Sequence, residues 1–229
     1  IGQDTLALYL HNGNEYLEAM IGAYMSRAAP FNVNYRYVAE ELLYLLNDSG
    51  ARAVVYHSAF APRLAEVRSQ LPNLEVLLQV ADESGNELLE GARWYEEALT
   101  DASPSIGQEL RASWSPDDLY ILHTGGTTGM PKGVMWRQAD IYVASMGGRP
   151  FGSPDEWESV GALVAAARAA HPTKTVPAPP FMHGAAHWAA FTAMSNGGCI
   201  VIPDAVDRFD APGVVELISR EQANVLLIV

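Results

Sequence analysis

Short apolar runs alternate with amphipathic segments along the whole chain. Helices are predicted where apolar residues recur at the spacing i, i+3, i+4, i+7, as they do in the segment from Leu17 to Tyr24. The expected helices cover residues 17–24, 38–46, 60–71, 94–99, 137–147 and 160–170, with a further helix through Trp188 and Phe191 and a last helix that opens at Asp210 and runs through Ile218. Strands are predicted at residues 5–10, 52–57, 75–80, 118–124, 199–203 and 224–229, and extended segments at residues 30–34 and 173–184. This alternation predicts an α/β fold with mainly parallel sheets flanked by helices on both faces.

The pattern lapses near residues 102–116, in the stretch ASPSIGQELRASWSP. We therefore expect a first α/β subdomain in residues 1–110 and a second in residues 111–229. The last residues, NVLLIV, have the composition of a buried parallel strand. Chain ends normally lie at the surface, so we expect the sequence to be an excerpt of a longer protein.

The acidic composition narrows the classes of partner. With 14 Lys and Arg against 27 Asp and Glu, the formal net charge is −13, which argues against a nucleic-acid-binding protein. No run of apolar residues is long enough to span a membrane. The single cysteine, Cys199, excludes an internal disulfide and is expected to be a small buried side chain. These features predict a soluble, cytoplasmic protein.

Chemistry is concentrated in residues 121–136, ILHTGGTTGMPKGVMW. This stretch is not a Walker A loop: counting back from Lys132 places Gly126 correctly, but Pro131 stands where glycine is required and Gly133 stands where Ser or Thr is required. Proline has no N–H to offer a phosphate, and the hydroxyl that would hold magnesium is missing. A dinucleotide-binding G-x-G-x-x-G loop opening a helix is not matched either.

The composition of the stretch still favours phosphate binding. Its glycines let backbone N–H groups turn toward an anion, its threonines add hydroxyl donors, and Lys132 adds a positive charge. The simpler alternative is a tight polar connection between a strand and a helix. Both interpretations place the stretch directly after the strand expected at residues 118–124.

At this point the residues resemble a known family. HTGGTTGMPKG is similar to the phosphate loop of the adenylate-forming (AMP-binding) superfamily, which includes acyl-CoA synthetases, luciferases and the adenylation domains of peptide synthetases. Gly125 is a mild departure, since many members carry Ser or Thr there. PAPPFMHGAAHW and GGCIVIP resemble two further family segments, so the similarity covers nearly the whole chain. It looks closest to the branch of fatty-acid and steroid CoA ligases, and it implies an N-terminal portion of such an enzyme.

The resemblance implies a role for each residue of the loop. The residues expected to bind the nucleotide phosphates are Thr124, Gly125, Gly126, Thr127, Thr128, Gly129 and Lys132. Thr127 is the expected neighbour of Mg²⁺, and Lys132 is expected to act catalytically by offsetting charge as pyrophosphate leaves. The family's adenine-binding, ribose-binding and C-terminal catalytic segments are not found in these residues.

His183 is the second expected catalytic residue, because the resemblance places it beside the acyl carboxylate and the path of CoA. Other interpretations are open. His183 could instead cap a helix, and its spacing to His187 is that of a helical metal pair, although Gly184 stands where a metalloprotease would have Glu. Trp188 could line an acyl pocket or belong to the core.

The leading hypothesis is an ATP-dependent acyl-CoA ligase. It would activate a fatty or steroid-side-chain carboxylic acid as an acyl-adenylate and transfer it to CoA, with ATP, Mg²⁺ and CoA as cofactors. The rival from another class is a truncated, non-catalytic relative that binds a nucleotide or a protein. A third interpretation, the luciferase-like or peptide-synthetase branch, shares the first half-reaction.

Overall fold

The computed structural model describes residues 3–125 and 129–228. The chain divides into two compact units, Ile1–Arg137 and Gln138–Val229, which are described separately below. The boundary that we expect from the sequence after residue 110 concerns subdomains, and it stays a prediction. In the structure, the strands between residues 119 and 137 belong to the sheet of the first unit.

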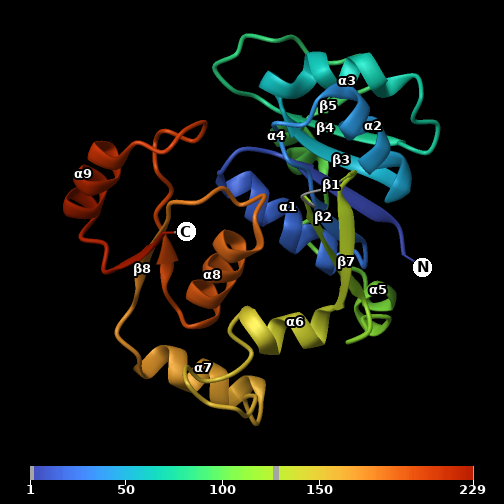
Figure 1. Ribbon diagram of the computed structural model, residues 1–229. Coiled ribbons are helices and arrows are strands. Elements are labelled where there is room, and N and C mark those ends of the chain that lie inside the picture. Colours follow the sequence, from blue (N-terminus) through green and yellow to red (C-terminus); the bar gives the residue numbers. More distant parts are fainter. Residues whose placement is uncertain (1–2, 126–128, 229) are drawn as a thin grey trace. The chain divides into compact units, whose positions relative to one another are not determined.

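The first unit is a helix-covered sheet whose elements can be followed in Figure 1. Its strands are β1 (Thr5–Tyr9), β2 (Ala29–Asn32), β3 (Ala51–His57), β4 (Val76–Val80), β5 (Arg93–Trp94), β6 (Leu119–Thr124) and β7 (Lys132–Arg137). Its helices are α1 (Asn14–Met25), α2 (Ala39–Asp48), the 3-10 turn η1 (Ser58–Phe60), α3 (Ala61–Arg68), α4 (Tyr95–Asp101) and α5 (Gln108–Ala112).

Seven strands form one sheet in the order β5-β4-β3-β1-β2-β6-β7. Every neighbouring pair is parallel except β6 and β7. Successive side chains of β1 point to opposite faces: Ala7 and Tyr9 join the core formed with α2 and α3, while Leu8 is buried outside that cluster. Apolar side chains of α1, such as Met20, are also buried outside it. The sheet is therefore covered on both faces, as parallel sheets require.

A hairpin ends this sheet and carries the glycine-rich stretch. β6 pairs antiparallel with β7 from Leu119 opposite Arg137 to Thr124 opposite Lys132. The sequence predicted β6 but missed β7, because the residues from Lys132 to Arg137 are mostly exposed and lack a buried apolar run. The stretch therefore connects two strands, and the simpler alternative of a strand-to-helix connection is wrong.

The second unit has a smaller sheet. Its elements are α6 (Gln138–Ser145), α7 (Val160–Ala169), β8 (Lys174–Pro177), α8 (Gly184–Ser195), β9 (Cys199–Ile200), α9 (Ala211–Glu221) and β10 (Val225–Leu227). The order β10-β8-β9 is parallel throughout. Val176 of β8 packs with Val214 and Leu217 of α9, and Figure 1 shows α8 and α9 on either side of β8.

The fold class predicted from the sequence is confirmed, and two finer predictions are wrong. The strand expected at residues 224–229 pairs with β8, but it is not buried: Val225 and Ile228 are 41% and 63% exposed. Cys199 is also exposed, because it begins the short strand β9 at the sheet margin. Within residues 3–125 and 129–228, no helix has the length and apolar character needed to cross a membrane.

Three histidines in the described residues are buried, His57, His123 and His187, and the shift in pKa is large for the last two, one in each unit. Burial lowers the pKa of His123 and of His187 from 6.5 to about 4 in each case. His187 is completely buried, and its Nδ1 lies 2.6 Å from the carbonyl oxygen of Phe181, to which it donates. The neutral forms are favoured because a charged imidazole would lose its hydration in these positions.

These lowered pKa values predict that the free energy of unfolding decreases as the pH is lowered. The decrease should begin at a pH well above the range in which carboxylates titrate. The unfolded chain takes up protons at its histidines near pH 6.5, while the folded chain does so only near pH 4. Stability is thus complete above pH 6.5 and declines as pH falls toward 4, by up to about 3 kcal/mol for each histidine. Urea unfolding between pH 7 and 4.5 measures this decline. It should be shallower in His187→Gln, whose amide can still donate to Phe181, and a pH-independent unfolding midpoint in the unaltered chain would contradict it.

The hairpin predicts a second stability effect. A Cβ added at Gly133 would lie 2.8 Å from Nε2 of His123 and 2.9 Å from Cγ2 of Ile121, closer than packed side chains tolerate. We expect Gly133→Ala to lower the free energy of unfolding by about 1–3 kcal/mol through overpacking. The matched control is Gly22→Ala, where an added Cβ meets nothing within 4 Å in the middle of α1, and which should be neutral or stabilising. Equal effects of the two substitutions would contradict the predicted clash.

Candidate functional site

The described ends of the phosphate loop lie directly opposite one another. Thr124 is the last residue of β6, Lys132 is the first residue of β7, and the two are paired in register. Side chains of directly opposed residues emerge on the same face of a sheet, with Cβ atoms roughly 5 Å apart. Both residues are exposed. A residue with a hydroxyl and a residue with an ammonium therefore begin on the same face of the hairpin, one at each end of the loop.

The register assigns the neighbouring pair to the opposite face. His123 lies opposite Gly133, and the imidazole fills the space that a side chain at Gly133 would need. His123 is 7% exposed, and its Nε2 lies 3.2 Å from the Oγ of Ser49. The alternation along the hairpin thus separates a buried histidine that packs from the exposed Thr124 and Lys132.

Among the described glycines of the loop, Gly129 has a backbone conformation that favours glycine. Gly129 has φ +118°, a conformation that side chains rarely adopt, whereas Gly125 has open space around the position of a Cβ. Pro131 is buried just before Lys132. Three of the residues expected to bind phosphate, Gly126, Thr127 and Thr128, lie outside the described residues.

Asn32, which the sequence analysis did not single out, holds the end of β6. Its Nδ2 donates to the carbonyl oxygen of His123 at 2.9 Å, and its Oδ1 accepts from the N–H of His123 at 2.7 Å. Asn32 is 6% exposed. A polar residue inside the apolar stretch PFNVN was the available signal, because a buried amide needs partners from elsewhere in the fold.

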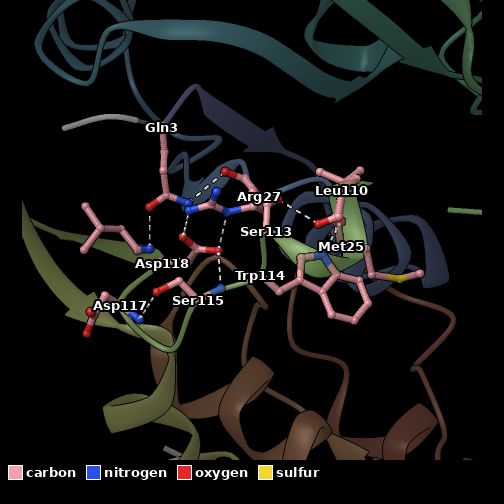
Figure 2. Close-up of polar contacts among 10 residues, drawn as sticks. Gln3, Met25, Arg27, Leu110, Ser113, Trp114, Ser115, Asp117 and Asp118 are labelled. Atoms are coloured by element: carbon pink, nitrogen blue, oxygen red, sulfur yellow. Dashed lines mark hydrogen bonds and ion pairs between the residues drawn. The ribbon is translucent and has the colours of Figure 1, made fainter. Parts of the chain in front are cut away.

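A second set of polar contacts holds the start of β6, as Figure 2 shows. Arg27 donates from Nε and Nη2 to the two carboxylate oxygens of Asp118, at 2.9 and 2.6 Å. This guanidinium lowers the pKa of Asp118, which is 4% exposed. Gln3 donates to the carbonyl oxygen of Arg27 and accepts from the N–H of Leu119. Arg27 keeps φ +60°, an uncommon value for a residue other than glycine.

The second unit contains the other expected catalytic residue. His183 is exposed and precedes the first residue of α8, after the fully buried Phe181 and Met182. It occupies the N-cap position by its backbone, but the structure shows no capping hydrogen bond from its side chain. His183 belongs to the second unit, whereas Thr124 and Lys132 belong to the first.

The metal interpretation of His183 and His187 finds no support. His187 uses Nδ1 for the carbonyl of Phe181 and is completely buried. No group of three or more metal-ligating side chains is found in residues 3–125 and 129–228. Trp188 is partly buried on α8, which is compatible with either of its two roles.

The donor set of the loop fits a polyphosphate. Lys132 supplies a positive charge, Thr124 supplies a hydroxyl beside it, and the open space at Gly125 allows close approach to the backbone. No carboxylate in the described ranges lies within ion-pairing distance of the Lys132 ammonium. The charge therefore remains accessible to an anionic ligand.

Curated relatives match the entire chain. The chain is 52% identical over 229 residues to the medium-chain acyl-CoA ligase Mig of Mycobacterium avium. The matched residues make up 100% of this chain and 41% of that protein. It is 36% identical over 231 residues to the 3-oxocholest-4-en-26-oate–CoA ligase of Rhodococcus rhodochrous, covering 98% of this chain and 40% of the relative. The chain thus spans about 40% of the length of these relatives.

Solved structures agree on the fold. The anthranilate CoA ligase AuaEII in complex with anthranoyl-AMP superimposes with a TM-score of 0.76 at 20% identity, covering 98% of this chain and 39% of that one. The N-terminal domain of FACL13 from Mycobacterium tuberculosis gives 0.72 at 23% identity, covering 98% and 49%. At these identities the likeness shows the fold alone.

The profile of the family described as AMP-binding enzyme matches residues 2–229. That range includes the hairpin with its phosphate-compatible loop as well as the segment that leads into α8. The chain belongs to the AMP-binding enzyme family.

Proposed function

We propose that the protein to which this chain belongs is an ATP-dependent acyl-CoA ligase. The observation that carries the proposal is the pairing of Thr124 with Lys132, which puts the two residues on one face at the two ends of a glycine-containing loop, with no carboxylate of the described residues in ion-pairing distance of the Lys132 ammonium. The names of the relatives support the class of reaction and two classes of acid, medium- to long-chain fatty acids and a steroid-side-chain acid.

The proposed reaction has two steps. An oxygen of the substrate carboxylate forms a bond to the α-phosphorus of ATP, and the bond to pyrophosphate breaks. The thiolate of CoA then forms a bond to the acyl carbon, and AMP leaves. The first step moves negative charge between oxygens, and the second moves it from the thiolate sulfur to an oxygen of AMP, so positioned donors and cations accelerate both without covalent catalysis by the protein.

The loop would act on the pyrophosphate portion of ATP. In this proposal, Lys132 offsets the charge that grows on pyrophosphate, Thr124 donates to a phosphate oxygen, and Gly125 and Gly129 let backbone N–H groups face the anion. The remaining proposed ligands are Gly126, Thr127 and Thr128. Mg²⁺, when bound, would neutralise phosphate charge beside the hydroxyl of Thr127.

His183 is the proposed catalytic residue of the second unit. Its exposed position before α8, next to the buried Phe181 and Met182, leaves the imidazole accessible while its neighbours pack. We place it near the acyl carboxylate and the path of CoA. The substrates of the proposed enzyme are therefore a carboxylic acid, ATP and CoA.

The test of this function is acid-dependent release of pyrophosphate from ATP. The longest native polypeptide that contains this chain is incubated with ATP, Mg²⁺ and either a medium-chain fatty acid, a long-chain fatty acid or a steroid-side-chain acid. At least one acid should accelerate pyrophosphate release, and addition of CoA should give the acyl-CoA thioester. A folded protein that releases no pyrophosphate with any of these acids would contradict the proposal.

Replacement of Lys132 by Ala should lower kcat/KM for acid-dependent pyrophosphate release about a hundredfold, the loss typical of one positioned electrostatic group. The thermal midpoint should stay unchanged because the side chain is exposed. Lys132→Arg, which keeps the charge, should retain more activity than Lys132→Ala. Arg149→Ala removes an exposed cation outside the hairpin and serves as the control. Equal rates for the Lys132→Ala and unaltered proteins would contradict the role proposed for Lys132.

A further inference from the structure

The side chain of Asn32 continues a strand pairing that the backbone does not. β2 and β6 run parallel with Phe31 opposite Ile121, and β2 ends at the next residue, Asn32. The chain after it stays with β1, since the N–H of Val33 donates to the carbonyl of Leu8. The Asn32 amide nevertheless reaches His123 and bonds both its N–H and its carbonyl. It thus provides the donor and the acceptor that a further backbone residue of β2 would have supplied.

This contact lies directly before the loop. His123 precedes Thr124 by one residue and Gly125 by two, so fixing both polar groups of the His123 backbone sets the direction in which the chain enters the loop. The same contact also affects the position of the Lys132 backbone, because Lys132 is paired with Thr124. The Arg27–Asp118 ion pair holds the opposite end of β6, four residues or more away from the loop.

We propose that Asn32 is a positioning residue for phosphate binding. It does not touch the loop ligands. By fixing the backbone of His123, it places the Thr124 hydroxyl and the Gly125 backbone where the phosphates of ATP need them. This inference rests on the proposed function for its ligand, and on the hydrogen bonds of Asn32 for its geometry.

The contact requires an amide. Aspartate has nearly the same shape but offers two acceptors, so one carboxylate oxygen would face the carbonyl oxygen of His123 without a proton between them. At a site that is 6% exposed, this charge also has little access to water. Serine can donate and accept, but its single oxygen on a shorter side chain cannot stand at both positions of the amide nitrogen and oxygen, so we expect it to keep at most one of the two bonds. We therefore expect the loop to be disturbed moderately in Asn32→Ser and more strongly in Asn32→Asp, relative to the unaltered protein.

The control is Asn34→Asp, two residues further along the same segment. Asn34 uses Oδ1 to accept from the N–H of Arg36, and an aspartate preserves that acceptor. Steady-state pyrophosphate release is measured in the longest native polypeptide containing the chain, with MgATP varied at saturating acid and then acid varied at saturating MgATP. Thermal midpoints are measured on the same samples.

We expect Asn32→Asp to raise the KM for MgATP about tenfold, the consequence of losing one well-made buried hydrogen bond. Asn32→Ser should give a smaller rise, while Asn34→Asp leaves the value unchanged and the KM for the acid stays the same in all three. A lower thermal midpoint with an unaltered KM for MgATP in both Asn32 variants would overturn the inference, because it would mean that Asn32 only stabilises the fold.

Hydrogen exchange separates this inference from the proposed function. If the unaltered protein releases no pyrophosphate, the proposed function fails, while the positioning of the loop entrance is still measured by exchange in a peptide covering residues 122–125. In Asn32→Ser and in any Asn32→Asp protein that folds, that peptide should exchange at least several-fold faster, with peptides of β3 unchanged. Uniform acceleration across the first unit, or none at the loop entrance, would contradict the positioning role.

Discussion

The antiparallel pairing of β6 with β7 is the interaction on which the proposed site depends. It turns a glycine-rich stretch into a loop whose two ends are fixed in register, so that Thr124 and Lys132 share a face. The pairing is possible at this distance because Gly133 leaves room for the side chain of His123. The placement of Thr124 and Lys132 therefore depends on the packing of His123 against Gly133, the neighbouring pair on the other face of the same hairpin.

Carboxylates beside the start of β6 are paired with cations, although the chain has a net charge of −13. At the distal end of the hairpin, Asp118 is neutralised by Arg27 and Asp117 by Arg137. The two carboxylates nearest the start of β6 are thus paired with cations, whereas Lys132 is exposed at the other end. Local pairing, rather than overall composition, allows an acidic chain to present a positive charge at the loop.

Periodicity was sufficient to predict most of the buried elements but few of the exposed ones. β1, β3 and β4 are rich in apolar residues, and they were predicted as strands at nearly the observed positions. β7 was missed because an edge strand buries little, and β10 was expected to be buried although Val225 and Ile228 are exposed. A single sequence records the apolar character of a strand, but its burial depends on what packs against it.

The candidate site likewise contains residues that the sequence singles out and one residue that it does not. A phosphate-binding role for Thr124, Gly125 and Lys132 was inferred from their residue types, which suit an anion when they lie close together, and it stays a prediction. The position of Asn32 in PFNVN showed that a buried amide would need a partner, but that partner, His123, is 91 residues away and meets Asn32 only because β2 and β6 are neighbours. Contacts of this kind are set by strand order, which local patterns do not specify.

Transfer of an oxygen isotope from the acid to AMP is the most direct test of the proposed acyl-adenylate. If the substrate carboxylate attacks the α-phosphorus of ATP, one carboxylate oxygen leaves with AMP after CoA attacks the acyl carbon. With ¹⁸O-labelled acid, ATP, Mg²⁺ and CoA, mass spectrometry should find one labelled oxygen in AMP and none in pyrophosphate. Unlabelled AMP, or label recovered in a phosphate released from the γ position, would contradict activation through an acyl-adenylate.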